Sequence, residues 1–169
     1  MRRFAILTAL VAMFSGLVVS TALADIPNGE STGEKPAPQG SLVIIGGALR
    51  FENAPIWSRI GELAGGAGSK IAIFPTASSN PEESARRVRT RLEQLEIESY
   101  TVPLAVRNSQ NNGFPTNFRE QAFDPAVIAE VRKANGIYFT GGSQARITEA
   151  LFTADLQPTP LLEAVWDVY

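Results

Sequence analysis

The stretch Ile71-Ala72-Ile73-Phe74-Pro75-Thr76-Ala77-Ser78-Ser79 decides the fold class of this chain. Four apolar residues in a row predict a strand buried on both faces, and the proline and small polar residues after them predict a loop at its carboxyl end. Strands of this kind are typical of parallel sheets that are covered by helices. Further strands are predicted at Leu42-Val43-Ile44-Ile45, at residues 99–104 and at residues 137–139.

Amphipathic stretches separate the predicted strands. Helices are expected after Asn53, Pro81, Asp124-Pro125, Gly141-Gly142 and Pro160, because each stretch has apolar residues at helical spacing after a cap, a proline or a glycine turn. Alternating strands and helices predict a flavodoxin-like three-layer α/β/α fold with a mostly parallel sheet. No strand follows the last helix, so the chain is expected to stop within the domain.

Residues 1–24 have the pattern of a secretory signal peptide. Arg2 and Arg3 precede an uncharged apolar stretch, and Ala22-Leu23-Ala24 is a small-x-small cleavage pattern. An uncleaved membrane anchor is the alternative, because the apolar stretch is just long enough to span a bilayer. Cleavage near Ala24 predicts a periplasmic or extracellular protein without stable membrane association. Residues 25–40, rich in Pro, Gly, Glu and Ser, are expected to form a disordered linker before the domain at 41–169.

The composition excludes several classes of site. The chain has no His and no Cys, so by itself it cannot assemble a Ser-His-Asp triad, a Cys-His pair, a disulfide or a His- or Cys-ligated metal site. The formal net charge of −2 becomes more negative once Arg2 and Arg3 are removed, which argues against nucleic acid as a partner. No nucleotide-binding glycine motif is present, and neither a metal nor an organic cofactor is expected.

Three loops follow the carboxyl ends of predicted strands: Gly46-Gly47, residues 75–79 and residues 140–144. Ligands bind at this edge of open α/β sheets, and glycines let backbone N–H groups approach an anionic ligand closely. The loops are therefore expected to face one crevice, which would be lined by Gly46, Gly47, Thr76, Ser78 and Ser143. The alternative is that the glycines only form tight turns.

Two side chains in the last loop have the chemistry of a site. Ser143 occupies a strand-turn-helix corner, but the chain lacks the second glycine of a nucleophile elbow and any histidine base, so Ser143 is not expected to be a nucleophile. The neutral amide of Gln144 can both donate and accept hydrogen bonds toward a bound amide group.

Taken together, residues 40–49 (GSLVIIGGAL), 74–78 (FPTAS) and 137–144 (IYFTGGSQ) resemble the cyanophycinase family of serine peptidases, whose fold is similar to that of class I glutamine amidotransferases. The resemblance covers about residues 40–169, the N-terminal part of the family's domain. It implies an exported serine-type peptidase that hydrolyses cyanophycin, an arginine-bearing poly-aspartate, to β-aspartyl-arginine dipeptides. The implied partner is this peptide-like polymer, and a homodimer is left open.

The resemblance also implies which site residues belong to this chain. Gly141 and Gly142 would supply backbone donors to an oxyanion or to substrate, and Gln144 an amide that orients the substrate. The family's serine, in a Gly-Thr-Ser-Ala-Gly motif, and its histidine are expected beyond Tyr169, so this chain holds no catalytic residue and is expected to be inactive alone. Family members often carry Asp where this chain has Ser143. An aspartyl dipeptidase-like hydrolase and a noncatalytic secreted α/β binding module are the alternatives.

Overall fold

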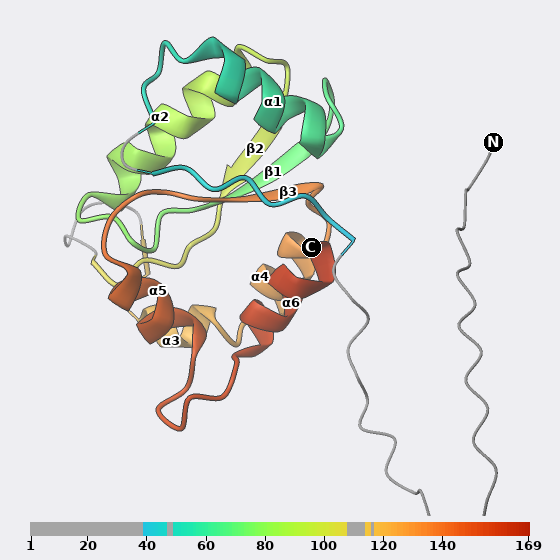
Figure 1. Ribbon diagram of the computed structural model, residues 1–169. Helices are drawn as coiled ribbons and strands as arrows, with labels where there is room; N and C mark the ends of the chain where they lie inside the picture. The colour runs from blue at the N-terminus through green and yellow to red at the C-terminus, as the bar shows by residue number, and fades with distance from the viewer. Residues whose placement is uncertain (1–38, 47–48, 108–113, 116) are drawn as a thin grey trace, which may run out of the picture. The chain divides into compact units, whose positions relative to one another are not determined.

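The computed structural model describes residues 39–46, 49–107, 114–115 and 117–169, which form an α/β fold (Figure 1). Its strands are β1 (Lys70–Phe74), β2 (Glu98–Thr101) and β3 (Gly136–Phe139). They form one all-parallel sheet in the order β2-β1-β3. The helices are α1 (Ala54–Ala64), α2 (Pro81–Glu93), α3 (Phe118–Gln121), α4 (Pro125–Val131), α5 (Gln144–Leu151) and α6 (Pro160–Val168). The predicted α/β fold with a parallel sheet is confirmed.

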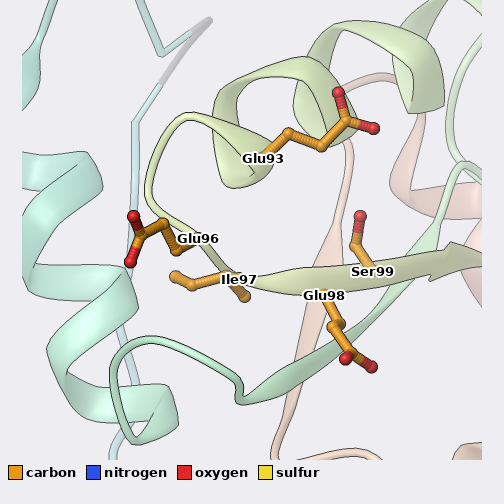
Figure 2. Close-up of a pocket in the computed structure, with 5 residues that line it drawn as sticks. All are labelled: Glu93, Glu96, Ile97, Glu98 and Ser99. Carbon is orange, nitrogen blue, oxygen red and sulfur yellow. The ribbon is translucent and has the colours of Figure 1, made fainter.

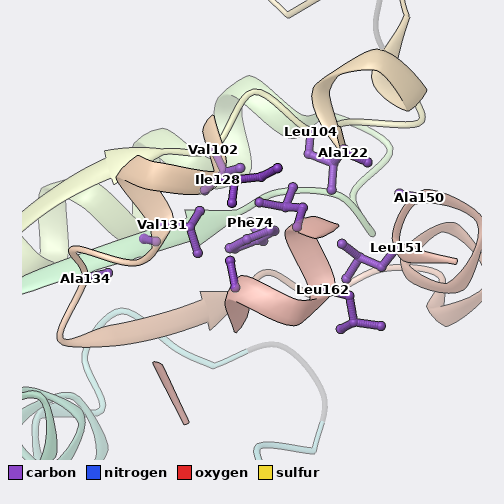
Figure 3. Close-up of a cluster of buried hydrophobic side chains, with 13 residues drawn as sticks. Phe74, Val102, Leu104, Ala122, Ile128, Val131, Ala134, Ala150, Leu151 and Leu162 are labelled. Carbon is purple, nitrogen blue, oxygen red and sulfur yellow. The ribbon is translucent and has the colours of Figure 1, made fainter. Parts of the chain in front are cut away.

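The central strand β1 separates two hydrophobic clusters. Ile71 and Ile73 pack with buried residues of α1 and α2, including Trp57. Ala72 and Phe74, on the opposite face, pack with buried residues of α4, α5 and α6 (Figure 3). Figure 1 shows the same division, with α1 and α2 on one side of the sheet and α3 to α6 on the other. The predicted three-layer arrangement is therefore present.

Local capping accounts for the positions of four helix starts. A side-chain oxygen accepts a hydrogen bond from a backbone N–H of the first turn at Asn53 (3.4 Å), Asn80 (3.4 Å), Asp124 (2.8 Å) and Thr159 (3.3 Å). Each of these helices also has a proline within its first two residues, where the missing N–H has no helical partner to lose. Among the described residues, no helix has the length and apolarity needed to cross a membrane.

The predicted strand at residues 42–45 is wrong. Leu42 and Ile44 are 69% and 85% exposed, and residues 41–46 make no backbone hydrogen bond to any described residue. β1 already has β2 on one side and β3 on the other, so the centre of the sheet is filled. An apolar run becomes a strand only where the free edge of another strand accepts its backbone groups, and local sequence does not reveal whether such an edge is in reach.

An open acidic hollow of about 450 Å³ lies at the amino end of β2. It is lined by Glu93, Glu96, Ile97, Glu98 and Ser99 (Figure 2). Figure 2 shows the three carboxylates pointing in different directions, and no group of acidic side chains in the described part of the chain could hold a metal ion. Because the hollow lies at the amino end of β2, it is distinct from the loops at the carboxyl ends of the strands.

Candidate functional site at the carboxyl ends of β1 and β3

The loops that follow β1 and β3 are joined at one carbonyl group. The oxygen of Ala77 accepts hydrogen bonds from the backbone N–H of Ser143 (3.0 Å) and from Nη1 of Arg146 (2.7 Å). The two strands are parallel neighbours, with Phe74 opposite Phe139 at their ends, so their loops leave the sheet at the same edge. The expected meeting of loops 75–79 and 140–144 is therefore present.

The two glycines of the second loop have different roles. Gly142 has a φ of +147°, and a Cβ atom on it would lie 2.0 Å from the Ala77 carbonyl oxygen, so no other residue fits there without moving the backbone. Gly141 is exposed, and a Cβ atom on it would meet nothing within 4 Å. The tight-turn alternative therefore explains Gly142, while the backbone at Gly141 remains open to a ligand.

The start of α5 adds hydrogen-bond donors next to Gly141. Ser143 is the N-cap residue, and its side chain makes no capping hydrogen bond. Gln144, the first residue of the helix, is exposed. The Arg146 N–H already donates to the Ser143 carbonyl (3.1 Å). The N–H groups that precede it in the first turn of a helix have no acceptor within the helix, and the helix dipole makes this end electropositive. This end of α5 can therefore hold a carbonyl oxygen or an anionic group.

Thr140 and Arg146 belong to this region although sequence analysis did not single them out. The Thr140 backbone N–H donates to Phe74 (3.0 Å), while its hydroxyl is buried without a hydrogen-bond partner. Buried hydroxyls of this kind are uncommon in folded proteins. A threonine at the end of a strand and an arginine on a short helix have no distinctive sequence pattern, so no local signal could have identified them.

The side chains of Thr76 and Ser78 form hydrogen bonds within the protein. Thr76 is fully buried and its hydroxyl donates to the carbonyl of Leu104 (2.8 Å). The Ser78 hydroxyl lies 2.7 Å from that of Ser84 and accepts a hydrogen bond from the Asn80 backbone (3.0 Å). Both side chains therefore have partners before any ligand binds, and their predicted role in lining a crevice is untested.

Gly46, the described residue of the remaining predicted loop, is not linked to the other two loops. Gly46 is exposed, and the space around it is open. It makes no backbone hydrogen bond to loops 75–79 or 140–144. Gly47 lies outside the described residues. Two of the three predicted loops are thus brought together through Ala77, and Gly46 of the third forms no backbone hydrogen bond to them.

The chemistry of this site is that of a donor array. It offers backbone N–H groups at Gly141 and at the start of α5 and the amide of Gln144, whereas the hydroxyl of Thr140 is buried. The chain contains no His and no Cys, so none of these groups has a histidine or thiolate base beside it. The arrangement can orient and polarise a carbonyl or an amide, but the nucleophile and base of a hydrolase would have to come from other residues.

Comparisons with known proteins support the fold. The chain is similar to the crystal structure of a peptidase from an acI-B1 Actinobacterium, with a TM-score of 0.54 and 22% sequence identity. The match covers 73% of this chain and 47% of that one, so the chain spans about half the length of the peptidase. No protein-family model matches the chain. At this level of identity the likeness concerns the α/β fold.

Proposed function

We propose that this chain forms the substrate-orienting part of an exported serine-type peptidase that hydrolyses cyanophycin to β-aspartyl-arginine dipeptides. The observation that carries the proposal is the junction at Ala77, which holds Gly141 and the start of α5 at the ligand-binding edge of the sheet. The likeness in fold to a peptidase and the resemblance of the three sequence motifs to the cyanophycinase family support it.

In the proposed reaction, a serine attacks a backbone amide and negative charge develops on its carbonyl oxygen. Donors that are already fixed in place stabilise this charge, and each is typically worth on the order of 10²–10³ in turnover. The N–H groups of Gly141 and Gly142 are the proposed donors. Gln144 would hold the amide in position through its own carbonyl and NH₂ groups.

The serine and its histidine base are proposed to come from residues beyond Tyr169. The chain has no histidine to supply the base, and its coverage of about half of the similar peptidase is consistent with this part of the proposal. The proposal therefore predicts that the reading frame continues past codon 169 into a Gly-x-Ser-x-Gly motif and a histidine. A fluorophosphonate probe would label the longer protein but not residues 1–169 alone. Labelling of the present chain would contradict the proposal.

Substrate binding tests the proposed role of Gln144. The purified chain is expected to co-sediment with insoluble cyanophycin, and Gln144→Ala is expected to weaken this binding several-fold. Gln94→Ala is the matched control, because Gln94 is also exposed but follows α2 near the opposite end of the sheet. Equal binding by both variants would mean that Gln144 has no role in substrate binding.

The binding assay and the reading frame beyond codon 169 also distinguish two alternative functions. The absence of histidine and cysteine also fits a noncatalytic secreted binding module. Such a module would bind the polymer in the same assay, but its reading frame would stop without a serine motif. An aspartyl dipeptidase-like hydrolase would cleave short aspartyl peptides in its longer form and leave cyanophycin intact.

Export is a separate part of the proposal. Cleavage after Ala24 is expected from the small-x-small pattern and the two arginines before the apolar stretch. Mass spectrometry of the protein from a secreting host would locate its first residue. An intact Met1 in the membrane fraction would instead support the uncleaved anchor.

A further inference from the structure

Arg146 brings to the candidate site a positive charge that forms no ion pair with another described residue. Its guanidinium donates a hydrogen bond from Nη1 to the Ala77 carbonyl oxygen (2.7 Å), while Nε and Nη2 have no hydrogen-bond acceptor among the described residues. A guanidinium has five N–H donors in a planar fork. The side chain is only partly buried, so these two nitrogens are available to a ligand.

The hydrogen bond to Ala77 fixes the place of the guanidinium in the site. The same carbonyl oxygen accepts the backbone N–H of Ser143 (3.0 Å), so the guanidinium and the start of α5 meet at one atom. Gly142 also lies against this oxygen, because a Cβ atom on it would be 2.0 Å away. The charge of Arg146 is therefore next to the turn that carries the proposed oxyanion donors.

The helix dipole adds to the positive potential at this place. Arg146 is in the first turn of α5, where the dipole favours anions and disfavours cations. This turn contains no acidic residue, and the carboxylate of Glu149, further along α5, pairs with Arg119 (3.6 Å). A bound anion would offset the unfavourable position of the cation.

We propose that Arg146 binds a carboxylate of the substrate and is a specificity-determining residue of the site. With Nη1 held at Ala77, Nε and Nη2 bind the two oxygens of the carboxylate, in the paired geometry that makes such hydrogen bonds strong. The inference rests on the proposed function, whose product is β-aspartyl-arginine. The arginine of that dipeptide is joined through its α-amino group, so its α-carboxylate is free. Arg146 binds this carboxylate and favours a polymer whose arginines retain it.

Two probes that differ in a single group test the carboxylate. N-acetyl-arginine has the acylated α-amino group and the free carboxylate of the substrate's arginine, whereas N-acetyl-argininamide has a neutral amide in place of the carboxylate. In NMR titrations the chain is expected to bind the acid about tenfold more tightly, or better. The net charge of −2 attracts the cationic amide at long range, so a preference for the acid reports local binding. Equal affinities in the wild-type chain, or no binding of either probe, would overturn the proposal.

The variant Arg146→Gln tests whether Arg146 supplies the preference. Glutamine keeps N–H donors but carries no charge, so the preference for N-acetyl-arginine is expected to disappear, with the melting temperature showing that the fold is retained. Arg87→Gln is the matched control, because Arg87 is exposed, forms no ion pair with a described residue and lies on α2, on the other side of the sheet (Figure 1). An unchanged preference in folded Arg146→Gln would overturn the proposal.

The wild-type chain gives the same test without a variant. The Nε–H resonance of Arg146 is expected to shift on titration with N-acetyl-arginine and not with N-acetyl-argininamide. A resonance that does not respond to the acid would mean that Arg146 does not bind the carboxylate.

Co-sedimentation with cyanophycin separates the failure of this inference from the failure of the proposed function. If the chain binds the polymer but does not distinguish the two probes, the proposed function stands and the role of Arg146 is wrong. If the chain distinguishes the probes through Arg146 but does not bind the polymer, the carboxylate site stands and cyanophycin is the wrong substrate.

Discussion

A Cβ atom placed on Gly142 would lie 2.0 Å from the carbonyl oxygen of Ala77. The two residues are far apart in sequence, yet the Ala77 carbonyl also accepts hydrogen bonds from Ser143 and Arg146. The close approach of these backbones is therefore the structural condition for joining the β1 and β3 loops. Anything that separates them would also displace Gly141 and the start of α5.

Gly142→Ala is expected to destabilise the fold by about 3 kcal/mol or more, because the new methyl group meets backbone atoms and the φ of +147° is strained for alanine. Gly141→Ala is the control, since that position has open space around it and no positive φ; its effect is expected to stay within about 0.5 kcal/mol. Urea unfolding of both variants measures the difference. A similar loss of stability in both variants would show that the backbone at Gly142 does not lie against the Ala77 carbonyl.

Thr76→Val is expected to cost about 1–3 kcal/mol, because it removes the hydroxyl that donates to the carbonyl of the buried residue Leu104. Thr76→Ser keeps the hydroxyl and loses one methyl group, worth about 0.8 kcal/mol. The melting temperature of Thr76→Val should therefore be lower than that of Thr76→Ser. The reverse order would mean that the methyl contact matters more than the hydrogen bond.

Ile44→Ala is expected to change stability by less than about 0.5 kcal/mol, because Ile44 is 85% exposed. Ile73→Ala, at a fully buried position of β1, is expected to cost about 2–5 kcal/mol. Denaturant unfolding of this pair tests the absence of a strand at residues 42–45. A large loss at Ile44 would place that residue in the core after all.

The fold is expected to lose stability above about pH 10. Burial raises the pKa of Tyr138 above its ordinary value of 10.0, and burial together with the charge of Glu130 raises the pKa of Tyr100. The folded state keeps these protons while the unfolded tyrosines release theirs, so unfolding becomes favourable as the pH rises past the unfolded pKa. Each tyrosine contributes at most about 1.4 kcal/mol per pH unit, and less here because both are partly exposed.

Melting temperatures measured between neutral and alkaline pH check this expectation. Tyr138→Phe and Tyr100→Phe should each flatten the alkaline decline. At neutral pH, Tyr100→Phe should have little effect, because the Tyr100 hydroxyl has no hydrogen-bond partner. If the melting temperature falls equally in the wild type and in both variants, the loss of stability at alkaline pH comes from titratable groups other than these two tyrosines.

Short-range patterns explain what could be predicted from the sequence. The helix after Asn53 and the helix after Asp124 begin where caps were expected, because a cap acts on N–H groups two or three residues away. β1 was predicted from four consecutive apolar residues, and Ala72, Ile73 and Phe74 are all fully buried. These features depend on neighbours in sequence, and together they indicate the α/β class and its three layers.

The candidate site depends on contacts that no local pattern records. Arg146 donates to a carbonyl 69 positions earlier in the chain, and the requirement for glycine at position 142 comes from the Ala77 backbone that lies against it. The run at residues 42–45 has the same apolar character as β1, but Leu42, Val43 and Ile44 in it are exposed. The sequence by itself determined which segments are helical or strongly apolar, because propensity, periodicity and capping act over a few residues. Only the tertiary structure decided which apolar run enters the sheet and which loops meet, because both depend on the strand edges and backbone groups that distant segments bring into reach.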